Sequence, residues 1–177
     1  MTGTIICAPM GIEARAVRQG LRDMGGPGGE APPGQHSADP PRVLRSGYGT
    51  GRAADRAEEL KATSFGQLVV MGVGAGLTAD LSPGDLVVGT EVGVATCPSA
   101  PLLAGELRRA GLPARAGRIA TVDHLVRRAE RAGLAADGTL LADMESAPLA
   151  AAAGDRPVAV VRAVSDTPHH QIGRAHV

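Results

Sequence analysis

Asp143-Met144-Glu145-Ser146 and Arg162-Ala163-Val164-Ser165-Asp166 are the two stretches that decide the fold of this chain. Each follows or closes an apolar run typical of a buried strand, and each delivers a carboxylate to the C-terminal end of that strand. In open α/β sheets, ligands bind outside the carboxyl ends of the strands. Two acidic side chains brought to this edge by two strands predict one shared site.

Outward from these stretches, short apolar runs alternate with segments of helical spacing. Strands are expected at residues 4–8, 43–46, 67–71, 85–92, 115–121, 139–142 and 157–164. Helices are expected at residues 11–24, 52–63, 101–110, 125–132 and 145–153. Residues 25–41 are dense in glycine and proline and are expected to form a loop. This alternation predicts an α/β fold with a largely parallel sheet.

The composition indicates one domain with an aliphatic core. The chain has 177 residues, of which 44% are hydrophobic, and Tyr48 and Phe65 are its only aromatic residues. Its formal charge is zero and its basic residues form no stripe, which argues against a nucleic-acid partner. Since no apolar run approaches the ~20 residues of a membrane span, and residues 1–10 lack the basic start of a signal peptide, a cytoplasmic location is expected.

Cysteine usage predicts no metal site. Neither Cys7 nor Cys97 has a second cysteine or a histidine at metal-ligand spacing. Both are expected to be reduced thiols.

The glycine-rich stretch Gly72-Val73-Gly74-Ala75-Gly76 allows two interpretations besides a simple turn. A nucleotide-binding Rossmann-type oxidoreductase would use it to bind phosphates, with Glu91 near the position of the ribose-binding acid. That fingerprint needs its third glycine one residue later and then a helix, whereas a loop returning to a strand is expected here. Alternatively, the glycines let the backbone approach a ligand closely.

Each acidic candidate also has a purely structural interpretation. Glu13 and Glu145 fit the first turn of a helix, where the macrodipole favours a carboxylate, and Asp166 could be an N-cap. Because Asp143 and Glu145 flank Met144, only one of the two is expected to reach a ligand.

Taken together, five motifs in this order resemble the purine nucleoside phosphorylase/uridine phosphorylase family. The motifs are Ile5-Ile6-Cys7-Ala8 with Glu13, Ser46-Gly47-Tyr48-Gly49, Gly72-Val73-Gly74-Ala75-Gly76-Leu77 with Gly84-Asp85-Leu86-Val87-Val88, and the two acidic stretches. Within the family, the chain is most similar to methylthioadenosine/S-adenosylhomocysteine nucleosidases and hopanoid-associated nucleoside phosphorylases. The resemblance implies a three-layer nucleoside phosphorylase-like fold around a mostly parallel, mixed central sheet.

The resemblance also implies an enzyme that cleaves the N-glycosidic bond of a purine nucleoside through an oxocarbenium-like ribose. Asp166 would then protonate or hydrogen-bond N7 of the leaving purine, and Ser165 would orient that carboxylate. Glu145 would accept hydrogen bonds from the ribose hydroxyls, with Met144 packed under the sugar. Glu13 would be the base that activates water.

Further substrate-binding positions follow from the same resemblance. Gly74 and Gly76 would line the site of the attacking water or phosphate, and the backbone of Val126 would contact the purine edge. Leu125 stands where the nucleosidases place a phenylalanine against the base, so aromatic stacking is lost there. Val73 replaces a serine of the nucleosidases and removes a hydroxyl.

The expected reaction is hydrolysis of an adenosyl substrate, such as methylthioadenosine or S-adenosylhomocysteine, with release of adenine. Phosphorolysis, including that of adenosylhopane, stays open, with phosphate as a co-substrate and Arg42, Arg45 and Arg52 as candidate phosphate ligands. No other cofactor is implied. Family members are commonly homo-oligomers in which a neighbour completes the pocket.

The C-terminal residues depart from the family pattern. The family continues past the Ser-Asp motif into a helix, whereas this chain ends in Ile172-Gly173-Arg174-Ala175-His176-Val177. That hexapeptide is what ATC-GGA-AGA-GCA-CAC-GTC encodes, a common sequencing-adapter string. We therefore expect residues 1–170 to be a single domain lacking its C-terminal helix and residues 171–177 to be non-native. An inactive fragment is the corresponding alternative.

Overall fold

A computed structural model describes residues 3–24 and 40–169. Most of the expected loop at residues 25–41, and all of the expected non-native tail at residues 171–177, lie outside these described ranges.

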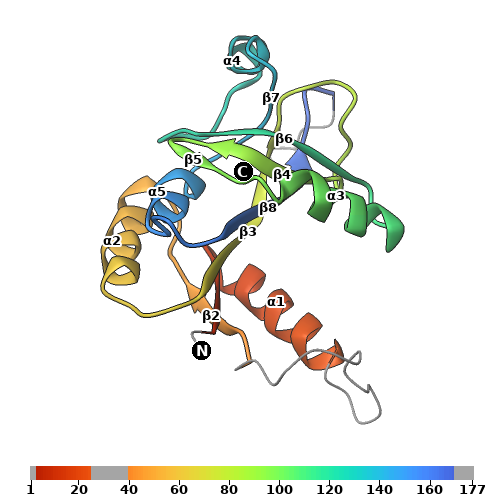
Figure 1. The fold of residues 1–177 in the computed structure, drawn as a ribbon. Coiled ribbons are helices and arrows are strands. Elements are labelled where there is room, and N and C mark those ends of the chain that lie inside the picture. The colour runs from red at the N-terminus through yellow and green to blue at the C-terminus, as the bar shows by residue number, and fades with distance from the viewer. Residues whose placement is uncertain (1–2, 25–39, 170–177) are drawn as a thin grey trace.

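Within the described residues, eight strands form one mixed sheet (Figure 1). They are β1 (Thr4–Ala8), β2 (Arg42–Arg45), β3 (Gln67–Gly76), β4 (Leu86–Val92), β5 (Ala95–Thr96), β6 (Ala114–Thr121), β7 (Thr139–Asp143) and β8 (Val158–Asp166). Strands β2, β1, β3 and β8 run parallel to one another, as do β4, β6 and β7. Antiparallel pairs join β8 to β4, β7 to the end of β3, and β4 to β5. The sheet therefore closes into a ring, which consists of β3, β8, β4, β6 and β7. Strand β1 pairs with β3 outside this ring, and β2 pairs with β1.

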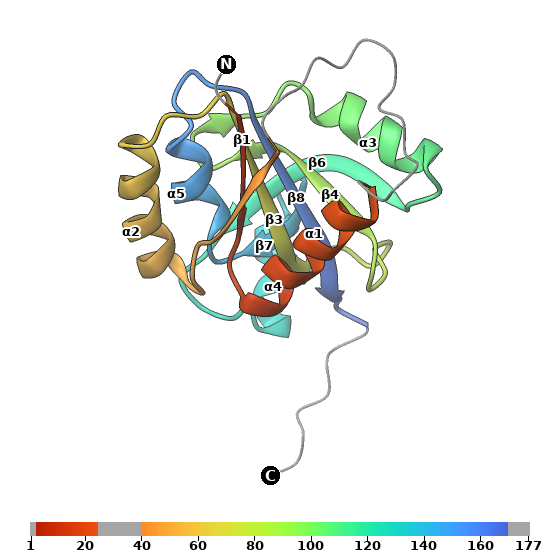
Figure 2. The same cartoon turned by 90° about the horizontal axis from the view of Figure 1, so that it is seen from below.

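Five helices flank this sheet in the described part of the chain. They are α1 (Gly11–Met24), α2 (Thr50–Lys61), α3 (Ala100–Arg109), α4 (Arg128–Ala135) and α5 (Ser146–Ala151). Helices α2 and α5 pack together on one side of β1 and β3, and α1 lies on the other side (Figures 1 and 2). The predicted three-layer α/β architecture with a mostly parallel, mixed sheet is confirmed.

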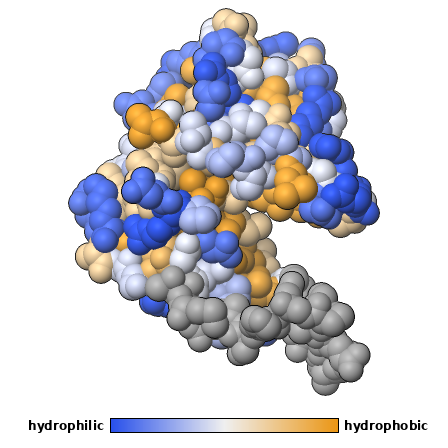
Figure 3. Space-filling view, in the orientation of Figure 1, coloured by the Kyte–Doolittle hydropathy of each residue, from blue (hydrophilic) through white to orange (hydrophobic). Residues whose placement is uncertain are grey.

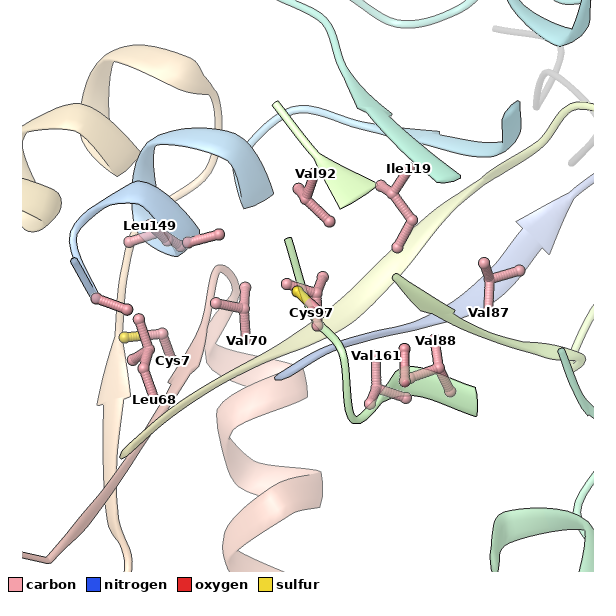
Figure 4. Packing of buried hydrophobic residues seen from close by; sticks show 14 of the residues in the cluster. Cys7, Leu68, Val70, Val87, Val88, Val92, Cys97, Ile119, Leu149 and Val161 are labelled. Carbon is pink, nitrogen blue, oxygen red and sulfur yellow. The ribbon is translucent and has the colours of Figure 1, made fainter. Parts of the chain in front are cut away.

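The core is built almost entirely from aliphatic side chains (Figure 4). Ile5 and Cys7 project from one face of β1 into the same buried cluster as Leu149 of α5. Side chains alternate along a strand, so Ile6 points to the opposite face, where Ala14 of α1 is also buried. Burial raises the pKa of the Cys7 thiol to about 11, which keeps it protonated at neutral pH.

The glycine-rich stretch is not a turn. Strand β3 continues through Gly76, paired with β8 as far as Ala75 and with β7 at Ala75 and Gly76. A Cβ on Gly72 would overlap the Arg162 guanidinium, and one on Gly74 would lie 2.8 Å from the Ala142 carbonyl oxygen. The glycines therefore allow close packing inside the sheet. Because β3 leads directly to β4 with no intervening helix, the Rossmann-type interpretation is wrong.

The surface is unevenly polar. On the face seen in Figure 3, hydrophilic side chains gather over α2 and α3, and apolar ones lie along a notch between the part carrying α3 and the part carrying α1. Several large apolar side chains are well exposed, among them Ile12, Val94 and Leu102.

Candidate active site

A cavity of about 1060 Å³ opens at the edge of the sheet where β1, β7 and β8 end. Figure 2 shows the end of β8, the first turn of α1 and α4 at this same edge. The volume of the cavity lies just above the range of about 300–1,000 Å³ that is usual for small-molecule pockets. Eight of the nine predicted site residues line it: Glu13, Gly74, Leu125, Val126, Met144, Glu145, Ser165 and Asp166. The ninth, Gly76, lies outside the lining.

Glu13 joins the first turn of α1 to the middle of β3. Its Oε2 accepts a hydrogen bond from the Met10 backbone N–H at 2.6 Å, and its Oε1 accepts one from the Val73 N–H at 2.9 Å. The first bond stabilises the start of the helix, as expected for an acid with a structural role in the first turn. The second bond holds the carboxylate against the strand that lines the cavity. The position of Glu13 therefore fits both the structural interpretation and a place in the site.

Glu145 is the N-cap residue of α5, just past the end of β7. Its Oε1 accepts a hydrogen bond from the Gly49 N–H at 2.8 Å, and its Oε2 lies 3.6 Å from Nη2 of Arg162. The residue is only 4% exposed. Burial raises the pKa of its carboxyl group above the usual range, and the Gly49 bond and the Arg162 charge only partly oppose this shift.

Beneath Glu145, Asp143 and Arg162 form a fully buried ion pair. Nε of Arg162 lies 2.7 Å from Oδ2 of Asp143, and both side chains are 0% exposed. Asp143 also accepts bonds from the Ser146 hydroxyl, the Ser146 backbone N–H and the Thr121 hydroxyl. With both its oxygens occupied, Asp143 holds the β7–α5 corner, and Glu145 is the acid with acceptor capacity left for a ligand.

Asp166 ends β8, and its two carboxylate oxygens have different partners. Oδ1 lies 2.8 Å from the Ser165 hydroxyl, which is also 3.0 Å from the Gly74 carbonyl oxygen. Oδ2 forms an ion pair with Nη2 of Arg131, from α4. The carbonyl oxygen of Gly76 accepts a bond from Nη1 of the same arginine at 2.7 Å. Gly76 therefore lies behind the site and supports Arg131.

The loop before α4 forms the rim of the cavity. Leu125 is 73% exposed there because α4 begins at Arg128, three residues later than the sequence predicts. His124 lies 2.7 Å from Asp123 and 3.3 Å from Glu130, and all three side chains are well exposed. Tyr48, following β2, also lines the cavity.

Two arginines that pair with acids at the site were not predicted from the sequence. Arg162 carried a usable signal, because a charged residue inside an apolar strand must be paired when it is buried. Arg131 carried none, because its partners lie on β3 and β8, far away in sequence. The three arginines considered as phosphate ligands, Arg42, Arg45 and Arg52, are exposed and do not line the cavity.

Residues 3–24 and 40–169 contain no group of three or more His, Cys, Asp or Glu residues placed to hold a metal ion. No helix in these ranges is long and apolar enough to cross a membrane.

Solved structures with the same fold include several nucleosidases. A 5′-methylthioadenosine/S-adenosyl homocysteine nucleosidase from Helicobacter pylori matches with a TM-score of 0.77 and 18% identity, over 96% of this chain and 86% of its own. Futalosine hydrolase of Helicobacter pylori matches with a TM-score of 0.76 and 18% identity, over 96% and 87%. An S-adenosylhomocysteine nucleosidase from Streptococcus pyogenes matches with a TM-score of 0.71 and 20% identity, over 96% and 86%.

Sequence comparison gives the family. A search of curated protein sequences found no match. The model of the phosphorylase superfamily, in contrast, matches residues 26–176, which is most of the chain. The same stretch contains both acidic motifs, and the fold is shared with solved nucleosidases. The chain thus belongs to the phosphorylase superfamily and is an enzyme of the nucleosidase or phosphorylase type.

Proposed function

We propose that the chain hydrolyses the N-glycosidic bond of an adenosyl-type nucleoside, such as methylthioadenosine or S-adenosylhomocysteine, and releases adenine. The observation that carries this proposal is the meeting of three carboxylates, from Glu13, Glu145 and Asp166, around one cavity. They come from three separate elements: the first turn of α1, the start of α5 and the end of β8. A developing ribose cation and a departing purine need negative charge and a proton donor at separate positions.

Asp166 serves the leaving base. As the C1′–N9 bond breaks, its electron pair passes to the purine, and a proton from the Asp166 carboxyl group goes to N7. The Ser165 hydroxyl, 2.8 Å from Oδ1, supports this role because it fixes the orientation of the carboxyl group. Val126 in the rim offers its backbone to the purine edge, and Leu125 offers an apolar contact.

Glu145 and Glu13 serve the sugar and the water. Glu145 accepts hydrogen bonds from the ribose hydroxyls, and its negative charge stabilises the oxocarbenium-like ribose. Met144, half-buried beside it, packs under the sugar. Water adds its oxygen to C1′ and gives a proton to Glu13, so the products are adenine and a free ribose derivative.

The position of the Glu13 carboxylate supports water rather than phosphate as the nucleophile, for two reasons. The Glu13 carboxylate occupies the Val73 N–H, a donor that a phosphate bound against β3 would otherwise use. An anionic phosphate beside that carboxylate would also be repelled. Phosphorolysis stays the alternative because the cavity lining also includes the cationic side chains of Arg127 and Arg128.

The test is adenine release from methylthioadenosine, followed by chromatography with and without phosphate. Hydrolysis predicts the same rate in both buffers, methylthioribose as the sugar product, and a rate about 100-fold or more lower in Glu13→Gln. Glu106→Gln is the matched control, because Glu106 is an exposed helix residue outside the cavity.

Strict dependence on phosphate, with a sugar phosphate as product, would replace hydrolysis with phosphorolysis. Absence of adenine release in both buffers would reject the adenosyl substrate.

A further inference from the structure

Arg131 is placed unlike any other residue of α4. It is the one buried residue of that helix, and its side chain is 4% exposed. Nη1 donates to the carbonyl oxygens of Gly76 at 2.7 Å and of Asp166 at 3.3 Å, and Nη2 pairs with the Asp166 carboxylate. All these contacts tie α4 to the ends of β3 and β8.

Anchoring the helix does not by itself account for an arginine. Desolvating a guanidinium is costly, and apolar side chains in place of both members of a buried ion pair are often neutral or stabilising. Nε of Arg131 is buried with no hydrogen-bond partner, which adds to that cost. A charge is needed here because the partner, Asp166, changes its own charge during the proposed reaction.

We propose that Arg131 is a positioning residue that acts through Asp166. This inference rests on the proposed function. When Asp166 has passed its proton to N7 of the purine, it is left as a carboxylate in a largely buried setting. Arg131 stabilises that carboxylate through Oδ2, while Ser165 holds Oδ1. The pair of contacts therefore favours transfer of the proton to the base and fixes the plane in which Asp166 meets it.

Two nucleoside analogues separate this role from a structural one. A 9-deazaadenosine carries a hydrogen on N7 and donates it to the ionised carboxylate. A 7-deazaadenosine has a C–H at that position and makes no such bond. Arg131 should matter for the first analogue only. In Arg131→Met, we expect the affinity for 9-deazaadenosine to fall about tenfold or more, the range of a hydrogen bond to a charged group. The affinity for 7-deazaadenosine should stay unchanged.

Turnover gives the second measurement. The kcat for methylthioadenosine should fall about 100-fold in Arg131→Met with little change in KM, because the lost contact acts on proton transfer. Arg131→Lys, which keeps the charge, should recover part of the loss. Arg118→Met is the control, since Arg118 also binds a carboxylate and a carbonyl oxygen but on the exposed surface outside the cavity.

The possible outcomes are distinct. Equal loss of affinity for both analogues means that Arg131 only holds the structure, and unchanged affinity and kcat mean that it has no role. Either result overturns the inference while leaving the proposed function intact. If the unaltered protein neither cleaves methylthioadenosine nor binds either analogue, the proposed function fails and the inference fails with it.

Discussion

Replacing Arg162 with methionine should lower the free energy of unfolding by about 3–5 kcal/mol, the range for breaking a buried ion pair from one side. Methionine fills much of the same volume, so a large cavity is not the cause. The cost arises because Asp143, 0% exposed and 2.7 Å from the arginine, keeps its charge without its counter-ion. For a chain of this length, the loss corresponds to a decrease in Tm of about 10 °C.

A second substitution isolates the charge. Asp143→Asn alone leaves the Arg162 guanidinium with only the more distant Glu145 carboxylate, 3.6 Å from Nη2, and should be destabilising as well. In the double variant neither charge remains, and the amide oxygen of asparagine can still accept the Ser146 N–H and the Thr121 hydroxyl. The double variant should therefore be more stable than the sum of the two single effects by about 2 kcal/mol, within the range for residues in direct contact.

Urea unfolding followed by circular dichroism at 25 °C measures all four proteins. Arg118→Met is the control, because the Arg118–Glu91 pair is about half exposed and such pairs contribute about 0–1 kcal/mol. Strictly additive single effects, or a loss in Arg162→Met no larger than in the control, would refute the argument that this buried pair holds the β7–α5 corner.

Two further predictions concern the same region. Gly72→Ala should destabilise the protein by about 1–3 kcal/mol in urea unfolding, because its Cβ would overlap the Arg162 guanidinium and lie 2.8 Å from Oε1 of Glu13. Gly20→Ala is the control, because Gly20 is an exposed position of helix α1 where an added Cβ meets no other atom. This substitution should be neutral or stabilising. At pH values above the folded-state pKa of the Glu145 carboxyl group, Glu145→Gln should have a higher Tm than the unaltered protein. Burial raises that pKa, so keeping the carboxyl group ionised in the folded protein costs stability as pH rises. The difference in Tm between the two proteins should disappear at pH values below the unfolded-state pKa. A difference that is the same at every pH in thermal scans would contradict burial of the charge as the cause.

Periodicity and turn chemistry were enough to predict most of the fold. The helix expected at residues 11–24 is observed at those bounds, and nearly all other elements lie within a few residues of their expected positions. The errors have identifiable causes. Strand β5 has two residues, too few to show a period. Strand β3 was ended too early because glycine is typical of turns, whereas here each glycine makes room for a side chain or carbonyl from a neighbouring strand.

The carboxylates of the candidate site were predictable for a different reason. Glu13 and Asp166 follow β1 and β8, which both run parallel to β3 and so have their carboxyl ends in the same direction. Glu145 follows β7, which runs antiparallel to the end of β3, so its place in the same site depends on a pairing that the expectation of a largely parallel sheet did not contain. The roles of the three acids in catalysis stay predictions until the variants are measured.

Arg131 and Arg162, which pair with acids at the site, were harder to predict. A buried carboxylate needs a counter-charge or hydrogen-bond donors, but the sequence does not say which element supplies them. For Asp143 the donor is two strands away, on β8; for Asp166 it comes from α4, whose expected start was misplaced by three residues. If α4 needed only an anchor here, apolar side chains in place of both Arg131 and Asp166 would often serve at least as well. In the proposed reaction, Arg131 contacts the acid that gives its proton to the leaving base, so the fold sets the position of the arginine and the reaction explains why a charge is needed there.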